Sequence, residues 1–176
     1  DLQLVESADS VSEHVKWVNN QPTTARLGVF VNTIDRAIAV ARQLEGREVV
    51  VLHSRMSAAH RQQIGQYLEN KLGQGAESRG LVVVGTQAIE ASLDIDLDAA
   101  STDLAPAASL IQRAGRVWRR PDPQRQSRLP GVSNLPLQIV REDSDVAHYP
   151  YFQSELDRTW KFLVGRTHLD APADLQ

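Results

Sequence analysis

Leu27-Gly28-Val29-Phe30-Val31 is a short apolar run, and two similar runs follow it along the chain. Val49-Val50-Val51-Leu52 and Leu81-Val82-Val83-Val84 share its length and are rich in β-branched residues. Continuous apolar runs of this length are typical of strands that are buried on both faces of a parallel sheet. The three runs therefore predict buried parallel strands of an α/β domain.

Two stretches with helical spacing connect these three runs. Ile34, Ile38 and Ala41 share one face of the first expected helix, and residues 57–72 form the second. Strands that alternate with helices in this way predict a mainly parallel sheet with helices on both faces and right-handed crossovers.

The two ends of the chain are expected to add further elements. The pattern Ser10-x-x-Glu13 is that of a capping box, which predicts a leading helix and connection within residues 1–24. Four prolines in residues 121–136 predict an extended linker. Residues 137–176 are expected to form a closing strand and a C-terminal helix.

The composition excludes several classes of protein. The 176 residues are 41% hydrophobic and 23% charged, with a net charge of −3, as in an ordinary globular domain. The absence of cysteine excludes disulfides and thiolate chemistry, and it favours a cytoplasmic location. No apolar run is long enough to span a membrane. The first residues form no signal peptide and include no initiator Met, so we expect a fragment of a longer protein.

Charge is distributed unevenly in the second half of the chain. Residues 90–103 contain five acids and no base, whereas residues 113–128 contain six arginines and one acid. If residues 110–120 were helical, Gln112, Arg116 and Arg119 would share one face and present donors that suit phosphate oxygens. The stretch predicts a phosphate clamp, and the alternative interpretation is a solvated basic face.

The motifs that usually accompany such a clamp are missing. The sequence contains no G-x-x-x-x-G-K-[ST] loop, no D-E-A-D or D-E-x-H segment and no H-E-x-x-H metal motif. Arginines that could face a phosphate without a loop to cradle it indicate half of a two-part site, and no metal site is expected.

Three segments in order resemble motifs IV, V and VI of superfamily 2 helicases. They are Phe30-Val31-Asn32-Thr33, the stretch from Val84 to Asp96, and Leu110 to Arg120. The residue pattern within these motifs is similar to that of the CRISPR-associated helicase-nuclease of type I systems, and the resemblance covers residues 25–165. The resemblance implies the RecA-like three-layer fold of a second helicase lobe, at residues 25–120.

The resemblance also implies a nucleotide site shared with a first lobe that is absent here. Arg116 and Arg119 would be catalytic arginines that reach the γ-phosphate of ATP, with Gln112 beside them. Asp94 would contact the ribose or those arginines. Arg113 is grouped with the cofactor-binding residues, and it could instead brace motif V through Glu90 or Asp94. ATP and Mg²⁺ would be held mainly by the first lobe.

A second implied site is the track for single-stranded DNA. Thr86 of motif V would contact the nucleic-acid backbone, with Gln87 near it, and Asn32, Thr33 and Arg55 would lie along the same track. Thr86 and Thr33 have a simpler alternative role as helix caps.

One departure from the superfamily is the pair Val117-Trp118, at positions where many members have Thr-Gly. The role of Trp118 remains open between core packing, contact with the other lobe and contact with a missing domain.

The resemblance implies a cytoplasmic enzyme of CRISPR antiviral defence. The full protein would hydrolyse ATP, translocate on single-stranded DNA, unwind DNA marked by a guide-RNA surveillance complex and cut it in a nuclease domain that uses a divalent metal. The isolated chain is expected to be inactive. The alternatives are the second lobe of another superfamily 2 motor such as a DEAD/DEAH-box RNA helicase, a non-catalytic docking domain, and a small-molecule transferase with an arginine anion site.

Overall fold

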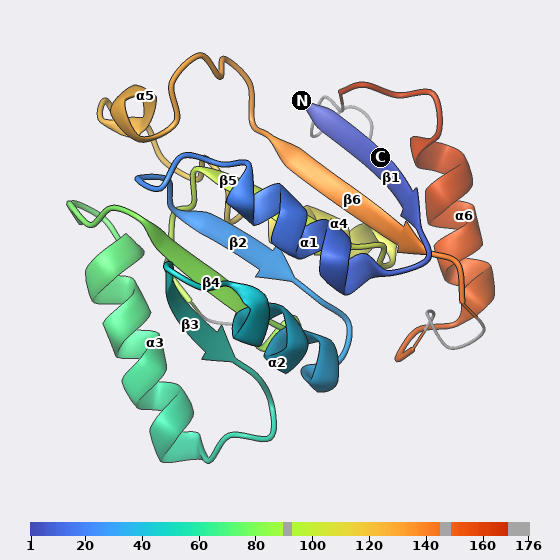
Figure 1. Ribbon diagram of the computed structural model, residues 1–176, viewed down its shortest axis with the longest axis horizontal. Coiled ribbons are helices and arrows are strands. Elements are labelled where there is room, and N and C mark those ends of the chain that lie inside the picture. Colours follow the sequence, from blue (N-terminus) through green and yellow to red (C-terminus); the bar gives the residue numbers. More distant parts are fainter. Residues whose placement is uncertain (90–92, 145–148, 169–176) are drawn as a thin grey trace.

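The computed structural model describes residues 1–89, 93–144 and 149–168. They form a six-stranded sheet in the order β1-β6-β5-β2-β4-β3, in which every neighbouring pair of strands is parallel (Figure 1). The strands are β1 (Leu2–Ser7), β2 (Leu27–Phe30), β3 (Glu48–Leu52), β4 (Leu81–Gly85), β5 (Ala99–Asp103) and β6 (Leu137–Glu142).

Helices cover both faces of this sheet, as predicted. Helices α1 (Ser10–Asn19) and α2 (Ile34–Gln43) pack on one face, in front of the sheet in Figure 1. Helices α3 (Ala58–Leu72), α4 (Ala107–Ala114) and α6 (Gln153–Leu163) pack on the other. Strand β4 shows how the two cores are separated, because Leu81 and Val83 face one core while Val82 and Val84 face the other. The result is the expected three-layer α/β fold.

The predicted strands are confirmed, although β3 lies at the edge of the sheet and is only partly buried. Two further strands were not expected. Strand β1 lies at the edge of the sheet, where Leu2 pairs with Leu137 of β6, so residues 1–24 are more than a helix and a connection. Strand β5 has the sequence Ala-Ala-Ser-Thr-Asp and is buried throughout. Its polar side chains have hydrogen-bond partners inside the lobe, which is why so polar a strand can lie at the centre of the sheet.

The cap of the first helix differs from the prediction. The carboxylate of Asp9 accepts a hydrogen bond from the backbone N–H of Ser12 at 3.1 Å, so Asp9 is the N-cap of α1. Ser10, the expected cap, is buried, and its hydroxyl donates to Glu142 of β6 at 2.6 Å. The serine therefore joins the helix to the sheet.

The expected extended linker at residues 121–136 contains a short helix, α5 (Arg125–Arg128). Two of its side chains, Arg125 and Arg128, are buried at 8% and 1% exposure. The prediction of an extended segment is wrong at this helix, because buried carboxylates of the lobe bind the two arginines and hold the segment against it.

Within the described ranges, no helix is long and apolar enough to span a membrane.

Candidate functional site

The candidate residues lie at opposite ends of the parallel strands, which we call the carboxyl edge and the amino edge of the sheet. Asn32, Thr33 and Thr86 directly follow β2 and β4, at the carboxyl ends of the parallel strands. Asp94 precedes β5, and residues 116–119 lie next to it because Leu97 and Val117 form a parallel bridge. The expected nucleic-acid residues are therefore separated from the expected nucleotide residues by the length of the strands, roughly 15 Å.

Asn32 faces into the lobe. Its backbone N–H donates to Asp103 at 2.8 Å, its side-chain amide donates to the carbonyl of Leu104 at 2.8 Å, and its side-chain oxygen accepts from Arg113 at 3.3 Å. The side chain is 4% exposed, so it joins β2 to the end of β5. Thr33 is the N-cap of α2, where its hydroxyl accepts from the N–H of Arg36 at 3.4 Å, which confirms the capping alternative.

The beginning of motif V is also held tightly. Thr86 is 3% exposed, and its carbonyl accepts from the N–H of Ile89 in the 3-10 helix η1 (Gln87–Ile89). The side-chain amide of Gln87 donates to the hydroxyl of Tyr151 at 3.0 Å, which links motif V to the segment before α6. Glu90 lies outside the described residues. Arg55 is exposed in the loop after β3, at the same edge of the sheet.

Arg113 lies at the carboxyl edge and not beside Asp94, while its predicted contact with Glu90 falls outside the described residues. Its side chain is completely buried on α4 and donates to the Thr102 hydroxyl at 2.7 Å and to the Tyr151 hydroxyl at 3.4 Å, besides Asn32. Its guanidinium therefore braces the carboxyl edge of the sheet and is enclosed away from Asp94, which pairs with other arginines. Sequence spacing could not show this, because it does not say which residues of an arginine-rich stretch face the core.

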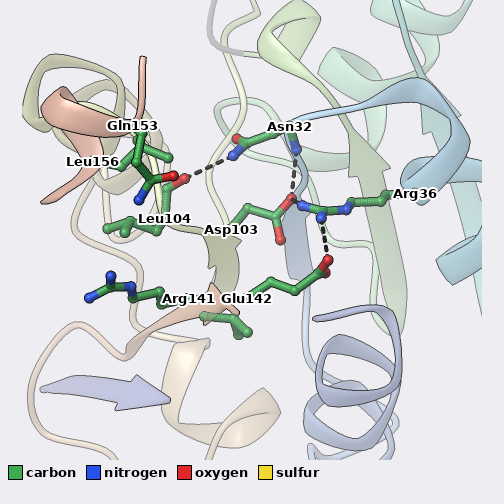
Figure 2. A pocket seen from close by; sticks show the side chains of 9 residues that line it. Asn32, Arg36, Asp103, Leu104, Arg141, Glu142, Gln153 and Leu156 are labelled. Atoms are coloured by element: carbon green, nitrogen blue, oxygen red, sulfur yellow. Dashed lines mark hydrogen bonds and ion pairs between the residues drawn. The ribbon is translucent and has the colours of Figure 1, made fainter. Parts of the chain in front are cut away.

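A small pocket of about 20 Å³ lies at the carboxyl ends of β2, β5 and β6, beside α6. Figure 2 shows Asp103 between Asn32 and Arg36, with Arg36 reaching on to Glu142. Arg36 pairs with Asp103 at 3.1 Å and with Glu142 at 2.8 Å. The pocket is lined by Asn32, Arg36, Asp103, Leu104, Val140, Arg141, Glu142, Gln153 and Leu156.

The charges around this pocket compensate one another. The ring of His14 is fully buried and is hydrogen-bonded to Asp103 at 3.0 Å and to Ser101 at 2.7 Å. Burial alone would raise the pKa of Asp103, but the hydrogen bond to His14 and the charges of His14 and Arg36 lower it to about 2. Sequence reasoning missed this cluster because its members come from α1, α2, β5 and β6 and share no local motif.

At the amino edge, the arginine-rich stretch is not one continuous helix. Helix α4 ends at Ala114, and Gly115 is its C-cap. Arg116 and Arg119 lie beyond it, so the prediction that they share a helical face with the exposed Gln112 is wrong. The chain instead runs beside residues 93–98, where the N–H of Leu97 donates to the Arg116 carbonyl at 2.9 Å. The Trp118 N–H donates to the Leu97 carbonyl at 3.0 Å, where a continued helix would have used a carbonyl of its own turn.

Asp94 is the carboxylate that meets the arginines of this segment. It pairs with Arg119 at 3.4 Å and is hydrogen-bonded to Arg120, and its side chain is 51% exposed. The hydrogen bond from Arg120, followed by the charges of nearby arginines, keeps the pKa of Asp94 below its usual value. Arg116 is half-buried and donates to the carbonyl of Leu93. Of the two contacts expected for Asp94, the structure shows the one with the arginines.

Asp96 and Trp118 support the same segment from inside. Asp96 accepts hydrogen bonds from the backbone N–H groups of Arg119 and Arg120, at 3.0 and 3.3 Å. The indole of Trp118 donates to the Asp98 carbonyl at 2.7 Å and packs against the core, while Arg125 lies 5.0 Å from its ring centre. Among the roles left open for Trp118, the structure shows core packing. Its φ of 52° is a left-handed conformation that favours glycine, the residue found there in many superfamily members.

A second buried carboxylate anchors the chain that follows. Asp98 accepts hydrogen bonds from the Arg26 backbone N–H at 2.9 Å and from the Arg128 guanidinium at 2.9 and 2.8 Å. Burial alone would lower the pKa of Arg128, but its bonds to Asp98 and Asp122 raise it. The opposite charges of residues 90–103 and 113–128 were the sequence signal for this network.

The part of the chain that the structure describes contains no group of three or more His, Cys, Asp or Glu side chains that could hold a metal ion.

Comparisons with known proteins extend this description. The family model described as CRISPR-associated nuclease/helicase Cas3, C-terminal, matches residues 23–122. The CRISPR-associated endonuclease/helicase Cas3 of Thermus thermophilus is 34% identical over 140 residues, which are 75% of this chain and 15% of that protein. The CRISPR-associated nuclease/helicase Cas3 of Methanothermobacter thermautotrophicus is 32% identical over 137 residues, with 77% and 15% coverage. The chain thus spans about 15% of the length of these relatives.

Solved structures show the same similarity. The crystal structure of T. fusca Cas3-ATP matches with a TM-score of 0.84 and 25% identity, over 99% of this chain and 23% of that one. A chain of a pre-nicking CRISPR RNA-guided surveillance complex matches with a TM-score of 0.68 and 25% identity, over 92% and 22%. The chain belongs to the Cas3 family of CRISPR-associated nuclease/helicases, in which it is the C-terminal, second RecA-like helicase lobe.

Proposed function

We propose that this chain is the second motor lobe of an ATP-dependent translocase on single-stranded DNA, within a longer protein of CRISPR defence that also carries a nuclease. Family membership supports the class of protein. The observation that carries the proposal is the amino edge, where Arg116 and Arg119 project from a backbone fixed by Leu97 and Asp96, with Asp94 as an exposed anionic partner.

The amino edge fits a phosphate. Guanidinium groups donate to carboxylates and phosphates with the same fork geometry, so a γ-phosphate oxygen can replace Asp94 as the partner of Arg119. ATP bound by a first lobe would bring negative charge to this edge. Arg116 and Arg119 would stabilise that charge as it develops in phosphoryl transfer, and arginines in this role accelerate related enzymes by about 10³ to 10⁵. Gln112 is exposed two residues before the end of α4 and would assist them.

The first lobe is proposed to supply what this chain lacks. The sequence has no P-loop, so the phosphates and Mg²⁺ would be held by the other lobe. The 176-residue chain by itself is therefore expected to hydrolyse no ATP above background. The nuclease domain, with its own divalent metal, would likewise lie in the remaining sequence.

The carboxyl edge is the proposed track for DNA. Ligands of open α/β sheets bind at the carboxyl ends of the strands, where Asn32, Thr33, Thr86 and Gln87 gather. Arg55 is exposed there and would contact a phosphate of the strand, whereas the buried threonine and asparagine would shape the edge and present backbone groups. Contacts with the phosphate backbone do not depend on the base sequence of the DNA, as a translocase requires.

A guide-RNA surveillance complex is the proposed partner of the full protein. The support is the structural match with a chain of such a complex.

The function is tested by ATP hydrolysis of the full-length protein in the presence of single-stranded DNA. Arg116→Gln and Arg119→Gln are expected to lower kcat by about 10² or more, because each removes charge stabilisation from the transition state. Arg158→Gln is the matched control, since Arg158 is exposed on α6 and its guanidinium donates to the Ser154 carbonyl of its own helix. Unchanged turnover in both test variants would instead favour a docking domain.

A further inference from the structure

We propose that Arg125 is a positioning residue for Arg119, acting through the carboxylate of Asp96. The inference rests on the proposed function, in which Arg119 reaches the γ-phosphate. Arg125 lies in the stretch that the sequence predicted to be an extended linker, and beyond residues 23–122 that match the family.

Arg119 needs a support outside its own segment. Helix α4 ends five residues before it, so no helical hydrogen bond fixes its backbone. Its N–H donates instead to Asp96 at 3.0 Å, and the next N–H, that of Arg120, donates to the other oxygen of Asp96 at 3.3 Å. The carboxylate of Asp96 therefore determines the direction in which the Arg119 side chain leaves the backbone.

Asp96 in turn depends on a cation. It is only 6% exposed, and a buried carboxylate is costly unless a cation and hydrogen bonds compensate its charge. Arg125 donates to both oxygens of Asp96, at 3.2 and 3.0 Å. The burial of Asp96 raises its pKa, and Arg125 is the largest charge that opposes this rise.

Arg125 also contacts the residues on each side of Arg119. Its guanidinium lies 5.0 Å from the ring centre of Trp118 and donates to the carbonyl of Arg120 at 3.0 Å. One buried guanidinium thus touches the residue before Arg119, the residue after it and the carboxylate that binds its N–H. A lysine has a single compact ammonium and cannot reproduce these contacts together.

The test is a double-mutant cycle in the full-length protein, measured as ATP turnover with single-stranded DNA. Arg125→Gln is expected to lower kcat by about 10-fold or more while the KM for ATP stays within about two-fold, because a displaced Arg119 weakens the transition state more than ground-state binding. Arg125→Lys is expected to restore little of the loss. The double variant Arg119→Gln/Arg125→Gln is expected to turn over no more slowly than Arg119→Gln alone.

The control for lost stability is Arg47→Gln. Arg47 is partly buried, and its guanidinium donates to the backbone carbonyls of Val18, Gln21 and Pro22, which lie outside the Asp96 and Asp98 networks. Per folded molecule, counted by DNA-binding titration, this variant should keep the parental kcat.

The outcomes separate the two proposals. If Arg119→Gln leaves turnover unchanged, the proposed function of this edge fails. If Arg119→Gln slows turnover but Arg125→Gln does not, the positioning role fails. If the losses of the two single variants multiply in the double variant, Arg125 acts independently of Arg119, and the positioning role fails as well.

Discussion

Removal of the Asp98 carboxylate tests how firmly residues 121–136 are held to the lobe. Asp98 is fully buried and accepts three hydrogen bonds of 2.8 to 2.9 Å, one from the Arg26 backbone and two from Arg128. Asp98→Ala leaves Arg128 with Asp122 as its remaining carboxylate, which is 19% exposed. The buried Arg128 guanidinium, which two carboxylates neutralised, is then left with one.

The expected loss follows from these contacts. A hydrogen bond to a charged group contributes about 1.5–3 kcal/mol, and the three bonds share one acceptor group, so their contributions do not add in full. Removal of one partner of a buried ion pair costs about 3–5 kcal/mol. We therefore expect Asp98→Ala to lower the free energy of unfolding by about 4 kcal/mol. Asp122→Ala should cost only about 1 kcal/mol, because Arg128 keeps its two bonds to Asp98.

The assay is urea unfolding of the 176-residue chain, followed by tryptophan fluorescence. With a slope of about 2 kcal/mol per M, the expected loss for Asp98→Ala shifts the midpoint by about 2 M. Trp118 reports on the segment directly, because it bonds to the Asp98 carbonyl and stacks with Arg125. A loss below about 1 kcal/mol, or one equal to that of Asp122→Ala, would refute the reasoning.

Three further predictions concern single positions. Trp118→Gly should be more stable than Trp118→Ala by about 1 kcal/mol in urea unfolding, because glycine removes the cost of φ = 52°; the reverse order would contradict this. Gly85→Ala should cost about 3 kcal/mol in the same assay, since an added Cβ would clash with the backbone carbonyl of Leu52, and a neutral substitution would show that the strands can separate. The pKa of Asp103, about 2 when folded against 3.8 as the ordinary value, contributes about 2 kcal/mol that is present above pH 4 and lost as the pH falls through 2. The stability advantage over Asp103→Asn should shrink by that amount between pH 5 and 2, and an advantage independent of pH would be inconsistent with a lowered pKa.

The strands that consist of a continuous run of apolar residues could be predicted from the sequence. The runs at 27–31 and 81–84 form β2 and β4, which are buried throughout and need apolar residues on both faces. The run at 49–52 forms the edge strand β3, which is only partly buried. Strand β5 escaped prediction since its burial depends on partners that are distant in sequence. Ser101 and Asp103 are satisfied by His14, which lies almost ninety residues earlier.

The site was predictable in its residue types but not in its geometry. The pattern from Leu110 to Arg120 identified the family, yet helical spacing could not show that α4 ends at Ala114. The chain turns at the left-handed Trp118, whose conformation is compensated by contacts with Asp98 and Arg125. Such compensation comes from tertiary packing, which no local pattern reports.

The most direct measurement concerns Arg116 and Arg119 in the full-length protein with a non-hydrolysable ATP analogue. A crystal structure of that complex gives the distances from their guanidinium nitrogens to the γ-phosphate oxygens. We predict hydrogen bonds of about 2.7–3.2 Å, with the pair between Arg119 and Asp94 opened to admit the phosphate. A γ-phosphate enclosed by other groups, with both arginines beyond hydrogen-bond reach, would contradict the assignment of this edge as half of an ATP site.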